Sequence, residues 1–269
     1  MNSDSYYEIG YSHTVCQDYA INGDNGVLKY AIISDGCSSS KNSDIGARLL
    51  AHLFKQYQLI PENIIMNLQQ LSNMTDIIQI NPEFLDSTLL IAFMSDKKTT
   101  VNIFGDGGFY VKFKDGHFEY YLVDFDQNAP LYISYFLHDT YQNYYKYFPN
   151  QKISLIKVSG KDWNEATTEV EDLTSFKNTD LFKRLMFNFE NVSFISVFSD
   201  GVRSFTMQDD NGLIVPVNDL SIVSRFNSYK SFQGQFVQRR MNKINKENKK
   251  LKISHYDDIS IATIHMEQK

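Results

Sequence analysis

An apolar run that ends in an acidic turn, LKYAIISDG at residues 28–36, decides how this chain folds. Leu28–Ser34 has the β-branched and aromatic content of a strand, and Asp35-Gly36 ends it. An Asp at a strand end is held by the sheet but projects into the next loop, and the glycine permits a tight turn close to a ligand. Two other strand-like runs end in the same way, Thr100–Gly105 before Asp106-Gly107 and Val192–Ser199 before Asp200-Gly201.

These acidic corners predict a metal centre. A fourth acidic pair, Asp257-Asp258, directly precedes the apolar run Ile259–Met266. Carboxylates brought together from several strand ends repel one another unless a cation lies among them. Ligands made only of oxygen favour Mg²⁺ or Mn²⁺ over softer metals. One Asp-Gly pair is an ordinary turn, but three of them on similar strands indicate a shared site.

Size and composition favour a single intracellular domain over residues 1–269. The formal net charge of −6 argues against a nucleic-acid-binding surface. The longest apolar stretch, Thr88–Met94, is far shorter than the roughly 20 residues that span a bilayer. The N-terminal sequence shows no secretion signal, and two cysteines, Cys16 and Cys37, provide no disulfide framework. We therefore expect a cytoplasmic protein that binds neither nucleic acid nor membrane.

Short strands that follow one another closely predict antiparallel hairpins. Ser87–Asp96 is followed by Thr99–Gly105 after two residues, and Phe109–Phe113 by Phe118–Val123 after four. A parallel pair would need a crossover of about a dozen residues. Strand pairs with helices inserted in blocks favour an α+β fold built around antiparallel sheets.

Three apolar stripes at helical spacing indicate the helices. The first covers residues 45–57 with Ser43 as its N-cap, and the second opens at Pro61. The third runs from Phe232 to Ile244, before the basic tract Lys246–Lys252, which we expect to be a solvated helix end. The stretch 128–149 is dense in Tyr and Phe, and either packs on the core or forms a surface that docks a partner.

The acidic corners belong to a longer series of landmarks in fixed order. Gly-x-x-His-x-x-x-Gln-Asp spans Gly10–Asp18, and Asp86-Ser87-Thr88 opens a strand between the first and second corners. This order resembles the metal-dependent Ser/Thr protein phosphatases of type 2C, particularly their compact bacterial branch. The resemblance covers residues 8–54, 86–113, 192–206 and 254–265, which is about half of the chain.

The resemblance implies both a fold and a set of metal ligands. The fold is two stacked antiparallel β-sheets flanked by helices, a four-layer α-β-β-α sandwich that holds two metal ions. In the family, the Asp matching Asp35 bridges both ions, and the carbonyl matching Gly36 binds one of them. Asp200 and Asp257 match the ligands of the other ion, and Asp18 matches an acidic residue that supports the second metal.

Four further positions follow or depart from the family pattern. Asp106 matches a ligand of a third, weaker ion in some bacterial members. His13 stands where many members carry an Arg that grips the substrate phosphate, so it contacts the phosphate, acts as a general acid, or makes a plain polar contact. Cys37 replaces a His of animal members and lacks a Cys-x₅-Arg context, so we expect a structural role. Asp258 replaces a usual Asn; it either tightens metal binding or, if salt-bridged, does nothing.

The sequence thus predicts a Mg²⁺/Mn²⁺-dependent phosphatase that hydrolyses phosphoserine and phosphothreonine in proteins, with Asp35, Asp200 and His13 as catalytic residues. Coordination lowers the pKa of water from about 15.7 to roughly 7, so a metal-bridging hydroxide serves as the nucleophile and no covalent one is needed. The expected partners are a phosphoprotein substrate and, as a further candidate, a cognate Ser/Thr kinase. Two alternatives remain open: a catalytically weak or inactive scaffold with this fold, and a small-molecule phosphatase or phosphodiesterase that uses the same two-ion site.

Overall fold

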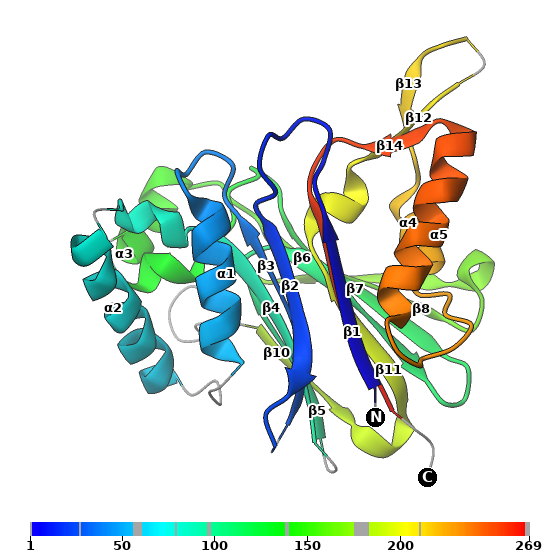
Figure 1. Ribbon diagram of the computed structural model, residues 1–269, viewed down its shortest axis with the longest axis horizontal. Coiled ribbons are helices and arrows are strands. Elements are labelled where there is room, and N and C mark those ends of the chain that lie inside the picture. Colours follow the sequence, from blue (N-terminus) through cyan, green and yellow to red (C-terminus); the bar gives the residue numbers. More distant parts are fainter. Residues whose placement is uncertain are drawn as a thin grey trace.

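Two antiparallel sheets stack face to face, and helices cover both outer faces (Figure 1). The computed structural model describes residues 2–26, 28–55, 61–78, 80–95, 98–137, 140–174, 183–209 and 211–266. The strands are β1 Asn2–Glu8, β2 Asp18–Asp24, β3 Lys29–Gly36, β4 Ser87–Met94, β5 Lys98–Phe104, β6 Gly107–Phe113, β7 Phe118–Phe125, β8 Ile153–Gly160, β9 Thr167–Asp172, β10 Lys183–Asn188, β11 Val192–Phe198, β12 Phe205–Gln208, β13 Ile214–Pro216, β14 Ile253–His255 and β15 Ile259–His265. The α-helices are α1 Ser43–Phe54, α2 Pro61–Ile78, α3 Thr140–Tyr147, α4 Asp219–Phe226 and α5 Phe236–Leu251, and the 3₁₀ turns are η1 Pro82–Leu85, η2 Ile133–Leu137, η3 Trp163–Glu165, η4 Phe189–Asn191 and η5 Asp200–Arg203.

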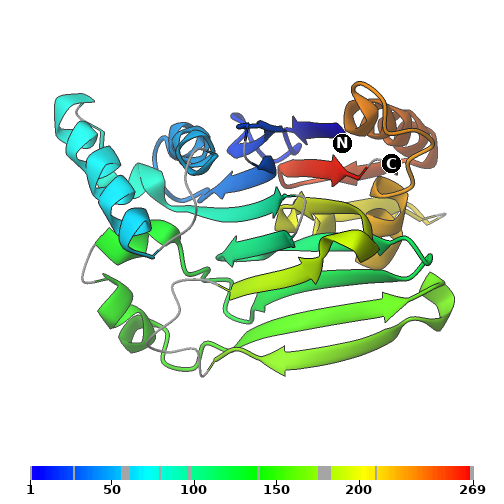
Figure 2. The same cartoon turned by 90° about the horizontal axis from the view of Figure 1, so that it is seen from below.

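The larger sheet has seven strands in the order β1-β15-β11-β6-β7-β8-β9, and the smaller has five in the order β10-β5-β4-β3-β2. Figure 2 shows the long β8–β9 hairpin at one edge of the molecule and the two termini at the opposite edge. Strand β9, with the sequence TTEVED, is exposed along its whole length, as expected for a charged edge strand. A third, three-stranded sheet, β13-β12-β14, projects beyond the sandwich (Figure 1).

Three apolar layers hold the sandwich together. The central layer lies between the two sheets and includes Ile33, Leu90, Val111 and Ile264, each no more than 1% exposed. A second layer packs the smaller sheet against α1 and α2, and a third packs the larger sheet against α4 and α5. These layers confirm the predicted four-layer α-β-β-α architecture.

The predicted hairpins are present. Strand β4 pairs antiparallel with β5, and β6 pairs antiparallel with β7. Every residue of β4 is buried, because this central strand of the smaller sheet is covered on both faces, which explains its continuous apolar sequence. The predicted first strand of the β4–β5 hairpin extended to Asp96, which lies outside the described residues.

The N-terminus of α1 differs from the prediction. Asn42, in a left-handed conformation, occupies the cap position, and Ser43 is the first helical residue. The Ser43 hydroxyl donates instead to the carbonyl oxygen of Cys37 at 2.8 Å, which ties the helix to the loop after β3. Ile45, assigned to the buried stripe, is 37% exposed, because α1 instead buries the side that carries the small residues Gly46, Ala47 and Ala51. Tyr57, the last member of that stripe, lies outside the described residues.

The other helical predictions agree with the structure more closely. Pro61 is the first residue of α2, whose Ile64, Leu68 and Leu71 are buried. Helix α5 begins at Phe236 rather than Phe232 and ends within the basic tract, whose lysines are exposed. Within the stretch 128–149, Ile133 and Tyr144 are buried, so the described part packs on the core; residues 138–139 lie outside it.

Candidate metal centre

The acidic corners meet at one end of the sandwich. Asp18 on β2 and Asp35 on β3 are direct register partners, and Asp35 also lies opposite Thr88 on β4. Asp106 sits in the turn between β5 and β6, between Gly105 and Gly107, whose φ angles of +81° and +113° are ones that glycine adopts most readily. The sheets therefore bring together carboxylates that are far apart in the chain.

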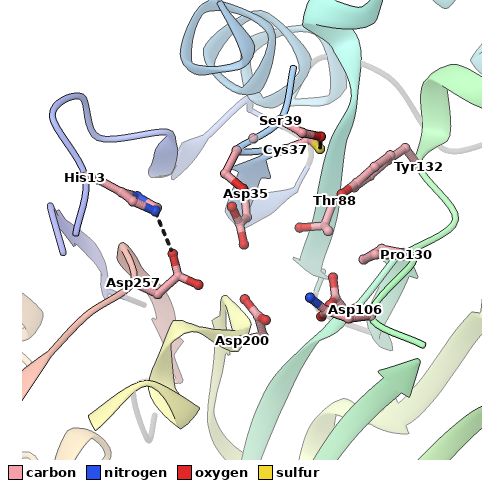
Figure 3. A pocket seen from close by; sticks show the side chains of 13 residues that line it. His13, Asp35, Cys37, Ser39, Thr88, Asp106, Pro130, Tyr132, Asp200 and Asp257 are labelled. Atoms are coloured by element: carbon pink, nitrogen blue, oxygen red, sulfur yellow. Dashed lines mark hydrogen bonds and ion pairs between the residues drawn. The ribbon is translucent and has the colours of Figure 1, made fainter. Parts of the chain in front are cut away.

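A cavity of about 270 Å³ opens at this point, which we call the acidic cleft. Figure 3 shows carboxyl groups facing it from three sides, with His13 beside Asp257 and Tyr132 on the opposite wall. Its lining consists of His13, Asp35, Gly36, Cys37, Ser38, Ser39, Thr88, Asp106, Asn128, Pro130, Tyr132, Asp200 and Asp257. Of the residues that the sequence marked as metal ligands or catalytic residues, Asp18 alone is absent from this lining.

Burial raises the pKa of every carboxyl group in the cleft, and repulsion by other cleft carboxylates adds to this for Asp35, Asp106 and Asp257. Burial raises the pKa of Asp35 well above its ordinary value, and the charges of Asp18 and Asp200 raise it further. The pKa of Asp106 is also raised well above the usual range, by burial first and then by Asp200. The pKa values of Asp200 and Asp257 shift upward mainly through burial. Ionised, this group of carboxylates is unfavourable without a compensating cation.

Asp18 lies beneath the cleft and is only 1% exposed. Its Oδ2 accepts a hydrogen bond from the Ser199 hydroxyl at 2.6 Å, and the same hydroxyl oxygen accepts one from the Ser260 backbone N–H at 3.0 Å. Its Oδ1 is buried without a hydrogen-bond partner in the described part of the chain. Burial raises the pKa of Asp18 to about 7.

Asp258 holds the loop that carries His13. One of its carboxylate oxygens accepts from the backbone N–H of Gly10 at 2.7 Å, and the other accepts from that of Gln17 at 2.6 Å. Nδ1 of His13 lies 3.0 Å from Oδ2 of Asp258, at ion-pair distance but off the line of a hydrogen bond. An Asn side chain offers only one oxygen and would turn its NH₂ group toward one of these N–H donors. Asp258 is 2% exposed and does not face the cleft; its ion pair with His13 agrees with the salt-bridged alternative, and its two backbone contacts add a role in holding the loop.

His13 itself faces the cleft. Its Nε2 lies 3.5 Å from Oδ1 of Asp257 (Figure 3). Burial lowers the pKa of His13, but the carboxylates of Asp258 and Asp257 outweigh this effect and the net shift is upward. The two carboxylates thus favour the cationic form of the imidazole at the rim of the acidic cavity.

The wall opposite His13 comes from a segment without a recognisable motif. Asp86 accepts hydrogen bonds from Ser134 at 2.6 Å and from Ser40 at 3.2 Å, and so joins η2 to the loop after β3. This places Tyr132 and Asn128 in the lining of the cleft. Sequence reasoning missed these residues, and only the aromatic density of the stretch 128–149 hinted at a special role.

The donor set fits a hard divalent cation. The cleft offers carboxylate and carbonyl oxygens, and one further buried carboxylate oxygen beneath it has no partner among the described residues. Within the described residues, no three acidic, histidine or cysteine side chains form a closed ligand cluster, so the carboxylates surround the cavity rather than converge on one point.

Comparisons with known proteins agree with this geometry. The profile of the family described as protein phosphatase 2C matches residues 9–253. A bacterial serine phosphatase has a TM-score of 0.53 at 11% identity, with 100% of this chain and 99% of that chain covered. For the serine/threonine phosphatase Stp1 from Staphylococcus aureus the TM-score is 0.51 at 13% identity, with 100% and 96% covered.

PppA of Pseudomonas aeruginosa, described as a key regulatory component of T6SS, has a TM-score of 0.53 at 11% identity, with 98% of this chain and 97% of that chain covered. At such low identities these likenesses concern the fold alone. No protein of the curated collection matches the chain in sequence. Because the family profile spans nearly all of it, the chain belongs to the protein phosphatase 2C family.

Proposed function

We propose that the chain is a metal-dependent phosphatase that hydrolyses phosphoserine and phosphothreonine in proteins, and that all of residues 1–269 form its single domain. The observation that carries this proposal is the cleft in which Asp35, Asp106, Asp200 and Asp257 face one another with raised pKa values. A pair of Mg²⁺ or Mn²⁺ ions would remove that repulsion.

Each carboxylate has a proposed place in the site. Asp35 would contact both ions, with the carbonyl oxygen of Gly36 on one of them, while Asp200 and Asp257 hold the other. Asp18 would support the site from below, and Asp106 would share a third ion with Asp200. Bound ions of this kind supply an activated water as the nucleophile and neutralise the phosphate charge.

The protein's own groups would orient the substrate. His13 has its Nε2 at the rim of the cleft, where it donates to a phosphate oxygen. Ser34 and Ser199 do not compete as nucleophiles, because both are fully buried and their hydroxyls donate to Thr88 and Asp18 inside the protein. Phosphoryl transfer directly to water thus needs no covalent intermediate on these side chains.

The cellular setting is also proposed. No helix in the described part of the chain is long and apolar enough to cross a membrane. Cys16 and Cys37 are both free thiols, which suits the reducing cytoplasm. There its substrate would be a phosphoprotein, and a further partner would be a cognate Ser/Thr kinase.

The test is hydrolysis of a phosphoserine and a phosphothreonine peptide with Mn²⁺, Mg²⁺, Ca²⁺ and EDTA in parallel. The proposal expects turnover with Mn²⁺ or Mg²⁺ and none with EDTA. Equal rates in EDTA would contradict the metal-dependent mechanism. No turnover with any metal would favour the scaffold, and turnover confined to small phosphates or diesters would favour a small-molecule hydrolase.

A further inference from the structure

Helix α5 carries a charge opposite to that of the whole chain. Its sixteen residues include six basic ones, Arg239, Arg240, Lys243, Lys246, Lys249 and Lys250, and one acidic one, Glu247, in a protein of formal net charge −6. The helix covers the outer face of the larger sheet, away from the layer between the sheets (Figure 1). This surface and the acidic cleft share no residue.

A second cavity, of about 190 Å³, lies where the first turns of α5 meet the segment after α4. We call it the basic pocket. Its aromatic side chains are Tyr229 and Phe236, whose ring centroids lie 5.2 Å apart in an edge-to-face arrangement. Its cationic residues are Lys230, Arg239, Arg240 and Lys243. The pocket thus combines an apolar surface with four positive charges.

Three of these four cations form no ion pair within the described part of the protein, although the charges of Asp4 and Glu247 act on Arg239 and Arg240. No carboxylate lines the pocket, and no ion pair is formed there by Lys230, Arg239 or Arg240. Lys243 contacts Glu247 at 3.5 Å, a solvent-exposed pair of small energetic value. Arg239 and Arg240 each donate to one backbone carbonyl, of Gln233 and Arg225, and a guanidinium has five N–H donors.

Two further observations indicate that an anion would be attracted by these side chains and not by the N-terminus of α5. Burial lowers the pKa of Arg240, and this effect together with that of the nearby Arg225 outweighs the opposite effect of Glu247, so an added negative charge would favour the guanidinium. The N-terminus of α5 is already occupied, because Asp4 accepts from the N–H groups of Val237 at 2.6 Å and Gln238 at 3.1 Å.

We propose that the basic pocket binds a small organic anion. An aromatic or aliphatic group would lie against the partly exposed Tyr229, which packs on the buried Phe236, and a single carboxylate, phosphate or sulfonate group would contact Arg239, Arg240 and Lys243. The volume is below the roughly 300–1,000 Å³ of pockets for drug-sized ligands, which limits the ligand to about one or two rings. This site is independent of the proposed phosphatase activity.

The experiment is a calorimetric titration of the full chain with naphthalene sulfonate, which offers a flat apolar body and one fixed negative charge. The wild type is expected to bind one equivalent. The double variant R239Q/K243Q alters two exposed side chains and is expected to bind at least about tenfold more weakly, because two charge-assisted contacts are lost. The matched control K246Q/K250Q removes the same charge from the same helix outside the pocket and is expected to bind like the wild type.

Three results would overturn the proposal. One is the absence of saturable binding to the wild type. Another is an equal loss of affinity in R239Q/K243Q and K246Q/K250Q, which would indicate a general charge effect of the helix. The third is equally tight binding of inorganic sulfate, which would mean that the aromatic residues of the pocket contribute nothing to the affinity. Thermal melting of each variant verifies that it is folded.

Discussion

The acidic cleft and the basic pocket collect like charges in opposite ways. In the cleft, Asp35, Asp106, Asp200 and Asp257 come from four distant parts of the chain and are set by the sheets. In the pocket, Arg239 and Lys243 come from successive turns of one helix. The cleft charges are enclosed and their pKa values rise, whereas much of the pocket rim meets solvent. The comparison teaches that enclosure, more than the number of charges, determines whether like charges require a bound counter-ion.

The largest effect is expected in the cleft. Asp200→Asn should lower metal-dependent turnover of a phosphopeptide at least about a thousandfold, since a bound cation supplies several kcal/mol of transition-state stabilisation. Glu169→Gln on the exposed strand β9 removes a charge outside both sites and should retain wild-type turnover. Full activity of Asp200→Asn with Mn²⁺ would show that Asp200 is not a ligand in the site.

The next effect concerns the loop over the cleft. His13→Ala and Asp258→Asn should each lower kcat/KM about tenfold or more, chiefly by raising KM, because a charge-assisted contact to phosphate is lost or misplaced. If Asp258 acts by positioning His13, the double variant should be no slower than His13→Ala alone. Steady-state kinetics of the four proteins tests this. Multiplying effects would instead show that Asp258 acts independently of His13.

Metal removal should make stability depend on pH. The folded pKa values of Asp18, Asp35, Asp106, Asp200 and Asp257 are raised above the ordinary 3.8. Their contribution to the stability of the metal-free protein is complete below about pH 4 and is lost as pH rises through the raised values, near 7 for Asp18.

The melting temperature measured in EDTA should therefore fall as the pH is raised across this range. Mn²⁺ at a hundred times its Kd should restore about 2.7 kcal/mol at neutral pH. Identical pH profiles with EDTA and with Mn²⁺ would contradict a cation among these carboxylates.

The smallest effect compares a neutralised charge in the acidic cleft with one on α5 outside the basic pocket. Asp106→Asn should stabilise the metal-free protein at pH 8 by about 1 kcal/mol, because it removes a buried charge and its repulsion by Asp200. Lys246→Gln on the exposed face of α5 should change the free energy of unfolding by less than about 0.5 kcal/mol. Urea denaturation in EDTA measures both. A destabilised Asp106→Asn protein would mean that this carboxylate is compensated by protein groups.

The sequence was most informative where chemistry and strand ends coincide. Asp35, Asp106 and Asp200 each follow an apolar strand, so the order of these corners predicted both the sheets and their meeting point. Strand β1 was missed, because NSDSYYE is largely polar and is held by backbone pairing with β15. The predicted N-cap of α1, Ser43, was one residue too late. Capping propensity does not reveal whether a hydroxyl has another partner, which is here the Cys37 carbonyl.

The remaining parts of both sites depend on tertiary packing. Tyr132 and Asn128 reach the cleft because Asp86 binds Ser134, a contact between residues remote in sequence. The role of Asp258 required knowing that Gly10 and Gln17 present their N–H groups to it. The basic pocket was hidden because its apolar surface comes from two aromatic residues that read as ordinary core.

The most direct test of the account is the anomalous scattering of crystals soaked in Mn²⁺. It predicts two peaks inside the acidic cleft, on either side of the Asp35 carboxylate, one of them also in contact with Asp200 and Asp257. An empty cleft at saturating Mn²⁺, or peaks only outside it, would contradict the central claim that these distant carboxylates together hold a pair of cations.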